Sequence, residues 1–240
     1  MAGKNALIVF AHQEKTSFNS ALKDAAVESL KKTGWDVTVS DLYEMKFNAV
    51  LSRDDIIGNP KNPNHFNYAF ETMEALEEGR LSKDIIAEQN KLRSADLVIF
   101  QFPLYWLGMP AIMKGWLERV FTQGFAYTLQ NIYDNGLFKN GILHFCGFQV
   151  LSPQIFWSPE GSSNKARTKM IELWKARLEN ISQEDPIHFV PTAMFDMSAK
   201  GGFQLKKEVQ KSNTNEHYGL SVGQHLGKGI PPNNQYRSEK

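Results

Sequence analysis

Two large aromatic residues, Tyr105 and Trp106, are placed in the sequence where they could stack against a flat ring. They follow an apolar run at 97–102, and a stretch with helical periodicity begins near Pro110. This order predicts a strand, a short loop and a helix. Parallel α/β sheets bind ligands on the loops at the carboxyl ends of their strands. The pair is therefore predicted to contact a planar ligand, although two core residues would fit the same local sequence.

The polar loop at 11–19 is a second candidate for ligand binding. It contains no glycine, so it lacks the glycine-rich fingerprint of a dinucleotide-binding Rossmann site. Thr16, Ser17 and Asn19 surround the expected start of a helix, whose free backbone N–H groups suit a phosphate. Simple capping of that helix explains these residues equally well. His12 is either a ligand contact or an ordinary loop histidine.

Three other patterns are better explained by structure than by chemistry. Residues 219–223 match the G-x-S-x-G elbow of serine hydrolases, but no apolar strand precedes them. His144 and Cys146 lie two positions apart in an apolar stretch, where core packing is favoured over metal binding. We therefore expect no metal site. The mixed charges at 71–91 predict a solvated face.

Alternating strands and helices must position these loops. Apolar runs predict strands at 5–10, 35–42 and 96–102, and periodicity predicts helices at 18–33, 83–93, 111–122 and 165–181. The polar stretch 43–81 is longer than an ordinary connection between two elements, so it is predicted to be an irregular loop with a functional role. This order is typical of a doubly wound α/β domain, expected over 1–185, followed by an irregular appendage over 186–240. Only one strand candidate, within 142–156, lies between the last two helices.

Composition narrows the class of protein. The 240 residues carry a formal net charge of +1, so bulk electrostatics favours neither nucleic acid nor a membrane surface as a partner. The single cysteine excludes an intrachain disulfide framework and fits a reducing compartment. The first apolar run is too short for a signal peptide or a membrane span. We expect a cytoplasmic protein.

Several of these segments together resemble the NAD(P)H:quinone oxidoreductase family. The matching residues are 6–9, 11–12, 16–19, 96–103, Trp106, 110–112, 114–116, 125–128, 141–148, 219–223 and 225–228. The last two stretches resemble the type 1 branch more than the shorter type 2 branch. The resemblance implies a flavodoxin-like fold, a bound FAD, a homodimer, and transfer of hydride from NAD(P)H through the flavin to a quinone.

The resemblance also implies roles for individual residues. His12, Phe18 and Asn19 would line the phosphate and ribityl part of FAD, and residues 104–107 would flank its ring system. Ala126, Tyr127 and Thr128 would border the nicotinamide and quinone pocket. The implied cofactor contacts are His12, Phe18, Asn19, Asn67, Leu104, Tyr105, Trp106, Leu107, Arg167 and Ile171.

Some positions depart from the family pattern. Asn67 stands in place of the usual glutamine, and Leu107 and Leu129 replace aromatic residues. A larger departure follows Lys139, where roughly thirty residues of the family, about one supersecondary unit, have no counterpart. In the family this segment supplies a central strand, a loop that contacts the flavin, and a tyrosine–histidine relay pair, so no catalytic residue can be named here.

Two consequences of the missing segment are expected. The sheet should lack one central strand and expose an inner edge, unless residues 142–156 take its place. The chain is then either a quinone reductase or, as the alternative, a catalytically impaired isoform that acts as an interaction partner or an unstable product.

Overall fold

The computed structural model forms two compact units. It describes residues 4–128, 141–187, 189, 192–196, 198, 200–201, 204–212 and 234–237. The first unit comprises Met1–Phe125, Ile155–Gln183 and Gln235–Lys240, and the second comprises Ala126–Gln154 and Glu184–Asn234. Leu129, Lys139 and the elbow-like pattern at 219–223 lie outside the described residues.

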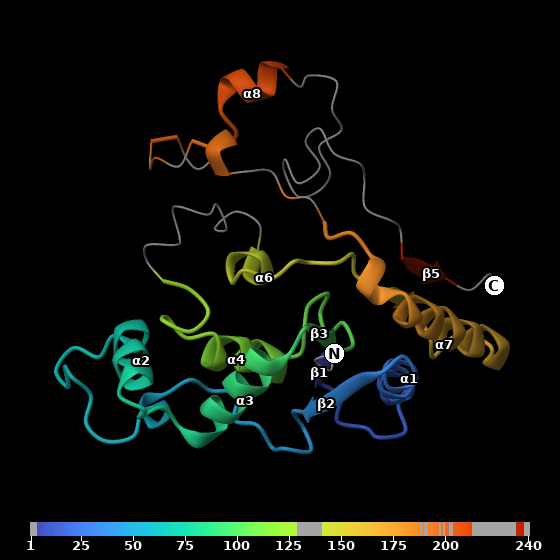
Figure 1. The fold of residues 1–240 in the computed structure, drawn as a ribbon, viewed down its shortest axis with the longest axis horizontal. Coiled ribbons are helices and arrows are strands. Elements are labelled where there is room, and N and C mark those ends of the chain that lie inside the picture. Colours follow the sequence, from blue (N-terminus) through green and yellow to red (C-terminus); the bar gives the residue numbers. More distant parts are fainter. Residues whose placement is uncertain are drawn as a thin grey trace. The chain divides into compact units, whose positions relative to one another are not determined.

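The first unit is organised around a parallel sheet of three strands in the order β2-β1-β3 (Figure 1). These strands are β1 (Lys4–Phe10), β2 (Trp35–Asp41) and β3 (Leu97–Gln101). The central strand β1 is buried from Ala6 to Phe10, as its unbroken apolar sequence predicts for a strand covered on both faces. The parallel α/β prediction is confirmed.

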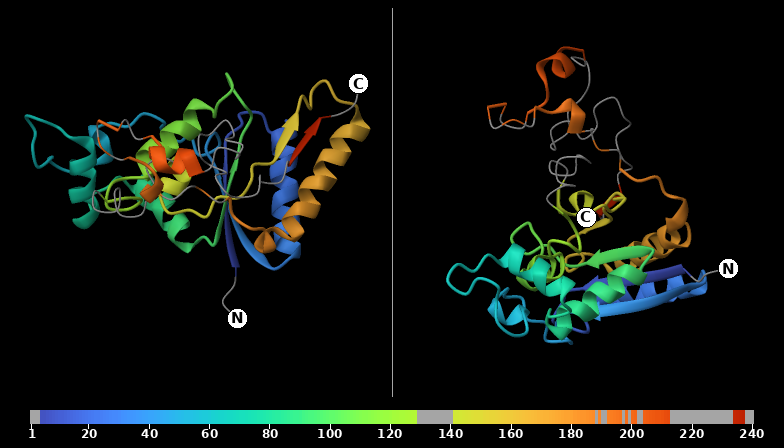
Figure 2. Two further views of the ribbon diagram at one scale, coloured as in Figure 1. Left: turned by 90° about the horizontal axis from the view of Figure 1, so that it is seen from above. Right: turned by 60° about the vertical axis from the view of Figure 1, so that its left-hand side comes forward.

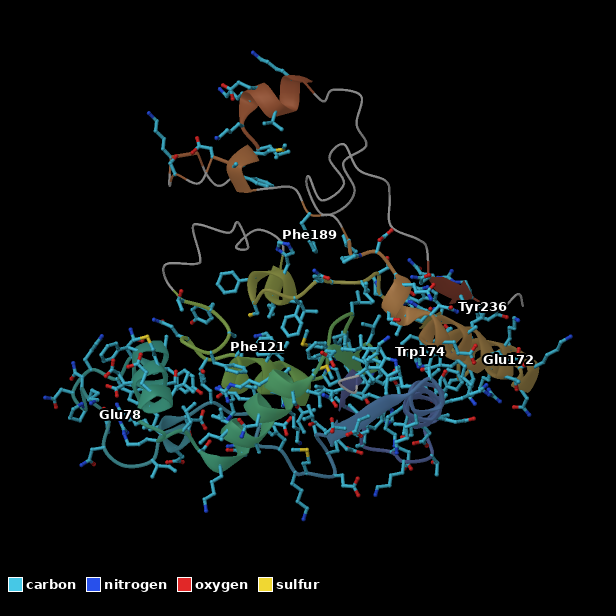
Figure 3. The ribbon with its side chains drawn as sticks, viewed as in Figure 1. Glu78, Phe121, Glu172, Trp174, Phe189 and Tyr236 are labelled. Atoms are coloured by element: carbon cyan, nitrogen blue, oxygen red, sulfur yellow. The ribbon has the colours of Figure 1, made fainter. Side chains whose placement is uncertain are left out.

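Helices cover both faces of this sheet. Helices α1 (Phe18–Lys32) and α7 (Asn164–Glu179) lie on one face, and α3 (Lys83–Ser94) and α4 (Ala111–Val120) lie on the other (Figure 2). Trp174 lies against α1 (Figure 3), where its indole N–H donates to Leu22 O at 3.2 Å. Two further contacts, Lys175 with Glu28 and Glu179 with Lys32, follow in the same order along both helices. The two helices therefore run parallel, with their N-termini at the same end.

The stretch 43–81, which was predicted to be an irregular loop, contains regular secondary structure. It holds the 3₁₀ turn η1 (Arg53–Asp55) and helix α2 (Tyr68–Glu77), which the sequence analysis did not predict. A small apolar cluster of Ile56, Ala75, Leu81 and Ile85 joins it to α3. The prediction of an irregular stretch was therefore wrong for residues 68–77.

The sheet ends at β3 within the part of the chain that the structure describes. Strand β4 (Ile155–Trp157) pairs in parallel with β5 (Gln235–Arg237) in a separate sheet of the same unit. Among the described residues, no strand pairs with the second edge of β3. Residues 142–156 do not replace the central strand, since they begin in helix α6 (Gly141–Phe145) and reach a strand only at Ile155.

The 3₁₀ turn η3 (Ile181–Gln183) follows α7 and ends this part of the first unit. The second unit contains α6, the 3₁₀ turn η4 (Thr192–Met194) and helix α8 (Lys207–Ser212). Phe195 and Leu205 form a small buried cluster. No helix in the described residues is long and apolar enough to cross a membrane.

Candidate functional site

The predicted ligand loops meet at the carboxyl ends of two neighbouring strands. Strands β1 and β3 are parallel, and Phe10 lies opposite Gln101 at their ends. The side chain of Gln101 donates from Nε2 to Asn19 Oδ1 at 2.9 Å, which connects the end of β3 to the start of α1. This is the edge at which open α/β sheets bind ligands.

The aromatic loop folds into a tight hairpin. Tyr105 N donates to Gly108 O at 2.9 Å, and Gly108 N donates to Tyr105 O at 3.1 Å. Trp106 and Leu107 at its tip have positive φ angles of 50° and 61°, which identifies a type I′ turn. Such turns favour asparagine and glycine, and a bulky residue at positive φ is strained. Backbone strain of this kind concentrates at functional sites.

The hairpin exposes its apolar side chains. The exposed fraction is 102% for Trp106 and 92% for Leu107. The alternative that Trp106 is a core residue is therefore wrong. Tyr105 is less exposed, and its hydroxyl donates to Gln13 Oε1 at 3.0 Å. The hairpin is thus tied to the first loop while the indole ring of Trp106 is free to contact a ligand.

The first loop is ordered by its own side chains. His12 accepts a hydrogen bond at Nδ1 from Glu14 N at 3.0 Å. One carboxylate oxygen of Glu14 accepts from the backbone N–H and the hydroxyl of Thr16, at 3.0 and 2.9 Å. These two bonds lower the pKa of Glu14. Ser17 Oγ accepts from Ser20 N at 3.1 Å, so the capping role of Ser17 is confirmed.

Replacing Ser17 by alanine should lower the free energy of unfolding by about 1 kcal/mol, because one N–H group at the start of α1 loses its acceptor. Ser17→Asn, which retains an acceptor oxygen, should recover most of that loss. Urea denaturation of the three proteins measures both effects. Equal stability of all three would show that the Ser17 side chain does not stabilise the helix.

Arg167 and Ile171 lie in the first half of α7. The Arg167 guanidinium donates to Pro159 O at 3.1 Å and to Ser162 O at 2.6 Å, and it also contacts Asn164. It therefore orders the loop that leads into α7. Because α7 and α1 run parallel, both helices begin at the end of the sheet where the hairpin lies.

The remaining predicted residues are placed differently. Asn67 caps α2, with its Oδ1 accepting from Phe70 N at 3.2 Å. Leu104 is half exposed before the hairpin. Ala126, Tyr127 and Thr128 belong to the second unit, in which the Tyr127 ring lies 5.3 Å from that of Phe145. Burial raises the pKa of the Tyr127 hydroxyl.

Two connecting residues were missed by the sequence analysis. Gln13 and Gln101 join the loops through the hydrogen bonds described above. A polar residue at the end of an apolar strand is the signal that could have identified Gln101, whereas nothing in the sequence singles out Gln13. No group of histidine, cysteine and acidic residues suited to a metal occurs in the described part of the chain.

The comparisons with known proteins agree with this geometry. A family model described as the flavodoxin-like fold matches residues 4–140. NAD(P)H dehydrogenase [quinone] 1 of Rattus norvegicus is 50% identical, and the alignment covers all of both chains. The chain belongs to the flavodoxin-like family of NAD(P)H:quinone oxidoreductases. The family prediction is confirmed.

Two further relatives support the same family membership. Ribosyldihydronicotinamide dehydrogenase [quinone] of Mus musculus is 45% identical over 81% of this chain and 99% of its own length. A solved structure from Klebsiella pneumoniae, assigned as a quinone reductase, superposes with a TM-score of 0.77 at 29% identity. That match covers 92% of this family member and 99% of the other chain.

The alignment with the rat relative also contains positions that have no counterpart in this chain. It runs over 274 positions, whereas this family member has 240 residues, so at least 34 positions hold a residue of the relative alone. The family-model match ends at residue 140, directly after Lys139, where the resemblance to the family predicts the gap.

Proposed function

We propose that this chain reduces quinones to hydroquinones with NAD(P)H, using FAD bound at the carboxyl ends of β1 and β3. The observation that carries the proposal is the strained hairpin that holds the Trp106 ring outward at that edge. The relatives, which are named as quinone dehydrogenases, support the reaction class. The overall reaction consumes NAD(P)H, a proton and a quinone, and yields NAD(P)⁺ and a hydroquinone.

The residues present fit a flavin. Trp106 and Leu107 offer a flat apolar surface, and the nearby start of α1 offers N–H groups for a phosphate. The hydrogen bond from Gln101 to Asn19 fixes the end of β3 against that helix start. FAD, when bound, supplies an acceptor and donor of hydride, which no protein side chain can provide.

The side chains then have separable tasks. His12, Phe18 and Asn19 would hold the phosphate and ribityl part, and Arg167 and Ile171 would contact the remainder of FAD. Leu104, Tyr105, Trp106 and Leu107 would exclude water from the ring system. Asn67 would contribute a further contact, and Ala126, Tyr127 and Thr128 would border the nicotinamide and quinone. We further propose a cytoplasmic homodimer with the FAD domain over 1–185 and the appendage over 186–240.

The test is to purify the full chain, add FAD, and record the absorbance of bound flavin together with NADH-dependent reduction of menadione. Bound flavin with turnover supports the proposal. A folded chain that binds no flavin and shows no turnover would contradict it and would favour the catalytically impaired isoform instead.

Trp106→Ala should weaken FAD binding roughly thirtyfold, because the cofactor would lose about 2 kcal/mol of apolar contact. The free energy of unfolding of the FAD-free protein should not change, since Trp106 is fully exposed. Fluorescence titration with FAD measures the affinity, and Trp106→Phe should restore most of it. Unchanged affinity in Trp106→Ala would exclude the hairpin from the cofactor site.

A further inference from the structure

Strand β3 has the properties of an interior strand with one unpaired edge. Its residues Leu97–Gln101 are all half-buried, whereas its neighbour β1 is fully buried from Ala6 onward. Its sequence is apolar at four successive positions, which is typical of a strand covered on both faces. Within the described part of the chain, β1 is its only strand partner.

The fold requires a strand at that edge. Flavodoxin-like sheets have the strand order 2-1-3-4-5, and the order observed here, β2-β1-β3, stops before the fourth position. The next strand, β4, pairs with β5 in a separate sheet of the same unit. The full-length relative has at least 34 positions that this chain lacks, which is enough for one strand and its connection.

The neighbouring side chains define the chemistry of the missing strand. The Phe100 ring lies 5.9 Å from the buried indole of Trp116 on α4. A strand that joins a parallel sheet between two helical layers must be apolar at successive positions. The backbone edge supplies hydrogen bonds, and the side chains on both faces supply selectivity for apolar residues.

We propose that the open edge of β3 binds an apolar peptide in extended conformation, supplied in trans, which adds to the sheet parallel to β3. The occupant has the chemistry of the central strand carried by full-length relatives at the positions absent here. Binding restores the fourth strand and pairs backbone groups of β3 that have no strand partner in the described structure. This proposal does not depend on quinone reduction.

The experiment titrates the full chain with a synthetic peptide corresponding to the part of the Rattus norvegicus relative that has no counterpart here after Lys139. We expect one peptide to bind per chain and to slow amide hydrogen exchange about tenfold or more at those residues of Leu97–Gln101 whose N–H groups face away from β1. A peptide of the same composition in scrambled order should do neither.

A matched control chain carries the same stretch in cis, inserted between Lys139 and Gly141. It should protect the β3 amides without added peptide and should bind none. Peptide binding to the control as tight as to the natural chain would overturn the proposal. Three other results would also overturn it. They are binding without protection of the β3 amides that face away from β1, protection of those amides already in the free monomer, and protection of them that rises with the concentration of the chain alone.

Discussion

Replacing Arg119 by methionine should lower the free energy of unfolding by about 3–5 kcal/mol, because it leaves a buried carboxylate without its cation. Arg119 and Asp55 are 3% and 1% exposed, and the guanidinium donates to Asp55 Oδ1 from Nε at 3.0 Å and from Nη2 at 2.6 Å. It also donates to Asp84 and to Asn48 O. Tyr68 adds a hydrogen bond to Asp55 at 2.6 Å.

Arg119 lies in the last turn of α4, whereas its partners Asp55 and Asp84, and Tyr68, which donates to Asp55, lie on other segments. Asp55 belongs to η1, Asp84 to the first turn of α3, and Tyr68 to the first turn of α2. A single guanidinium therefore fixes the stretch between β2 and α3 to the helix that follows the hairpin. Its removal should loosen that whole stretch.

Lys114→Met is the matched control on the same helix. Lys114 pairs with Glu118, and both side chains are about half exposed, so this change should cost no more than about 0.5 kcal/mol. Urea unfolding of both variants compares the two effects. Equal losses would show that the buried network contributes no more than a surface ion pair.

The pH dependence offers a second check on the Arg119 network. Burial raises the pKa of Asp84, but the hydrogen bonds from Arg119 and Ser82 outweigh burial and hold that pKa below its usual value of 3.8. A lowered pKa in the folded state adds stability above the usual value, which is lost as the pH falls below it. Arg119→Met should therefore show a weaker loss of stability between pH 4 and pH 2 than the natural protein.

The strands and the place of the candidate site could be predicted because they depend on local sequence. An unbroken apolar run specifies β1, and the loops that follow β1 and β3 carry the candidate residues as expected. The strain at Trp106 and Leu107 could not be predicted. A type I′ turn is normally signalled by asparagine and glycine, and neither residue stands at the tip of this hairpin.

Buried charges were harder to predict than apolar segments. The mixed charges at 71–91 suggested a solvated face, yet Glu71 and Glu88 are fully buried, so that prediction was wrong for these two residues. Glu71 accepts from two backbone N–H groups, and Glu88 accepts from the indole N–H of Trp116 at 2.8 Å. The N–H groups that donate to Glu71 and the indole that donates to Glu88 are 9 to 28 positions away. Glu88 also pairs with Lys91, three positions along α3, but such a pair is equally typical of an exposed helix face. The local pattern therefore does not reveal that these carboxylates are buried.

The pairing of β4 with β5 could not be predicted from the sequence either. Both strands are short, and the paired residues Ile155 and Gln235 are far apart in the sequence. The segment Glu184–Asn234 of the second unit lies between them along the chain. Three-residue strands carry little periodicity. Their pairing is decided by which segments are brought together in three dimensions, and this cannot be inferred from one sequence.

Gly115→Ala should destabilise the protein by about 1–3 kcal/mol or more, although the same change stabilises most helices by up to about 1 kcal/mol. Gly115 lies in the middle of α4, and a Cβ atom there would lie 2.0 Å from Ala49 O. Because the obstacle is backbone, no side-chain rotation can relieve the clash. The segment at Ala49 would have to move away from α4.

Thermal unfolding measures the effect, with a shift of the midpoint of about 2–4 °C per kcal/mol for a chain of this size. Lys114→Ala, on the exposed face of the same helix, is the matched control and should change the midpoint little. A higher midpoint for Gly115→Ala would mean that α4 and Ala49 are not in close contact.

The double variant Gly115→Ala, Arg119→Met tests whether both residues act on the same contact. Arg119 donates to Asn48 O at 2.9 Å, and Gly115 accommodates the adjacent Ala49. Once one change has displaced this segment from α4, the other has less to disrupt. The combined loss should therefore be smaller than the sum by at least about 0.5 kcal/mol. Strict additivity would instead mean that the segment remains in place when either contact is lost.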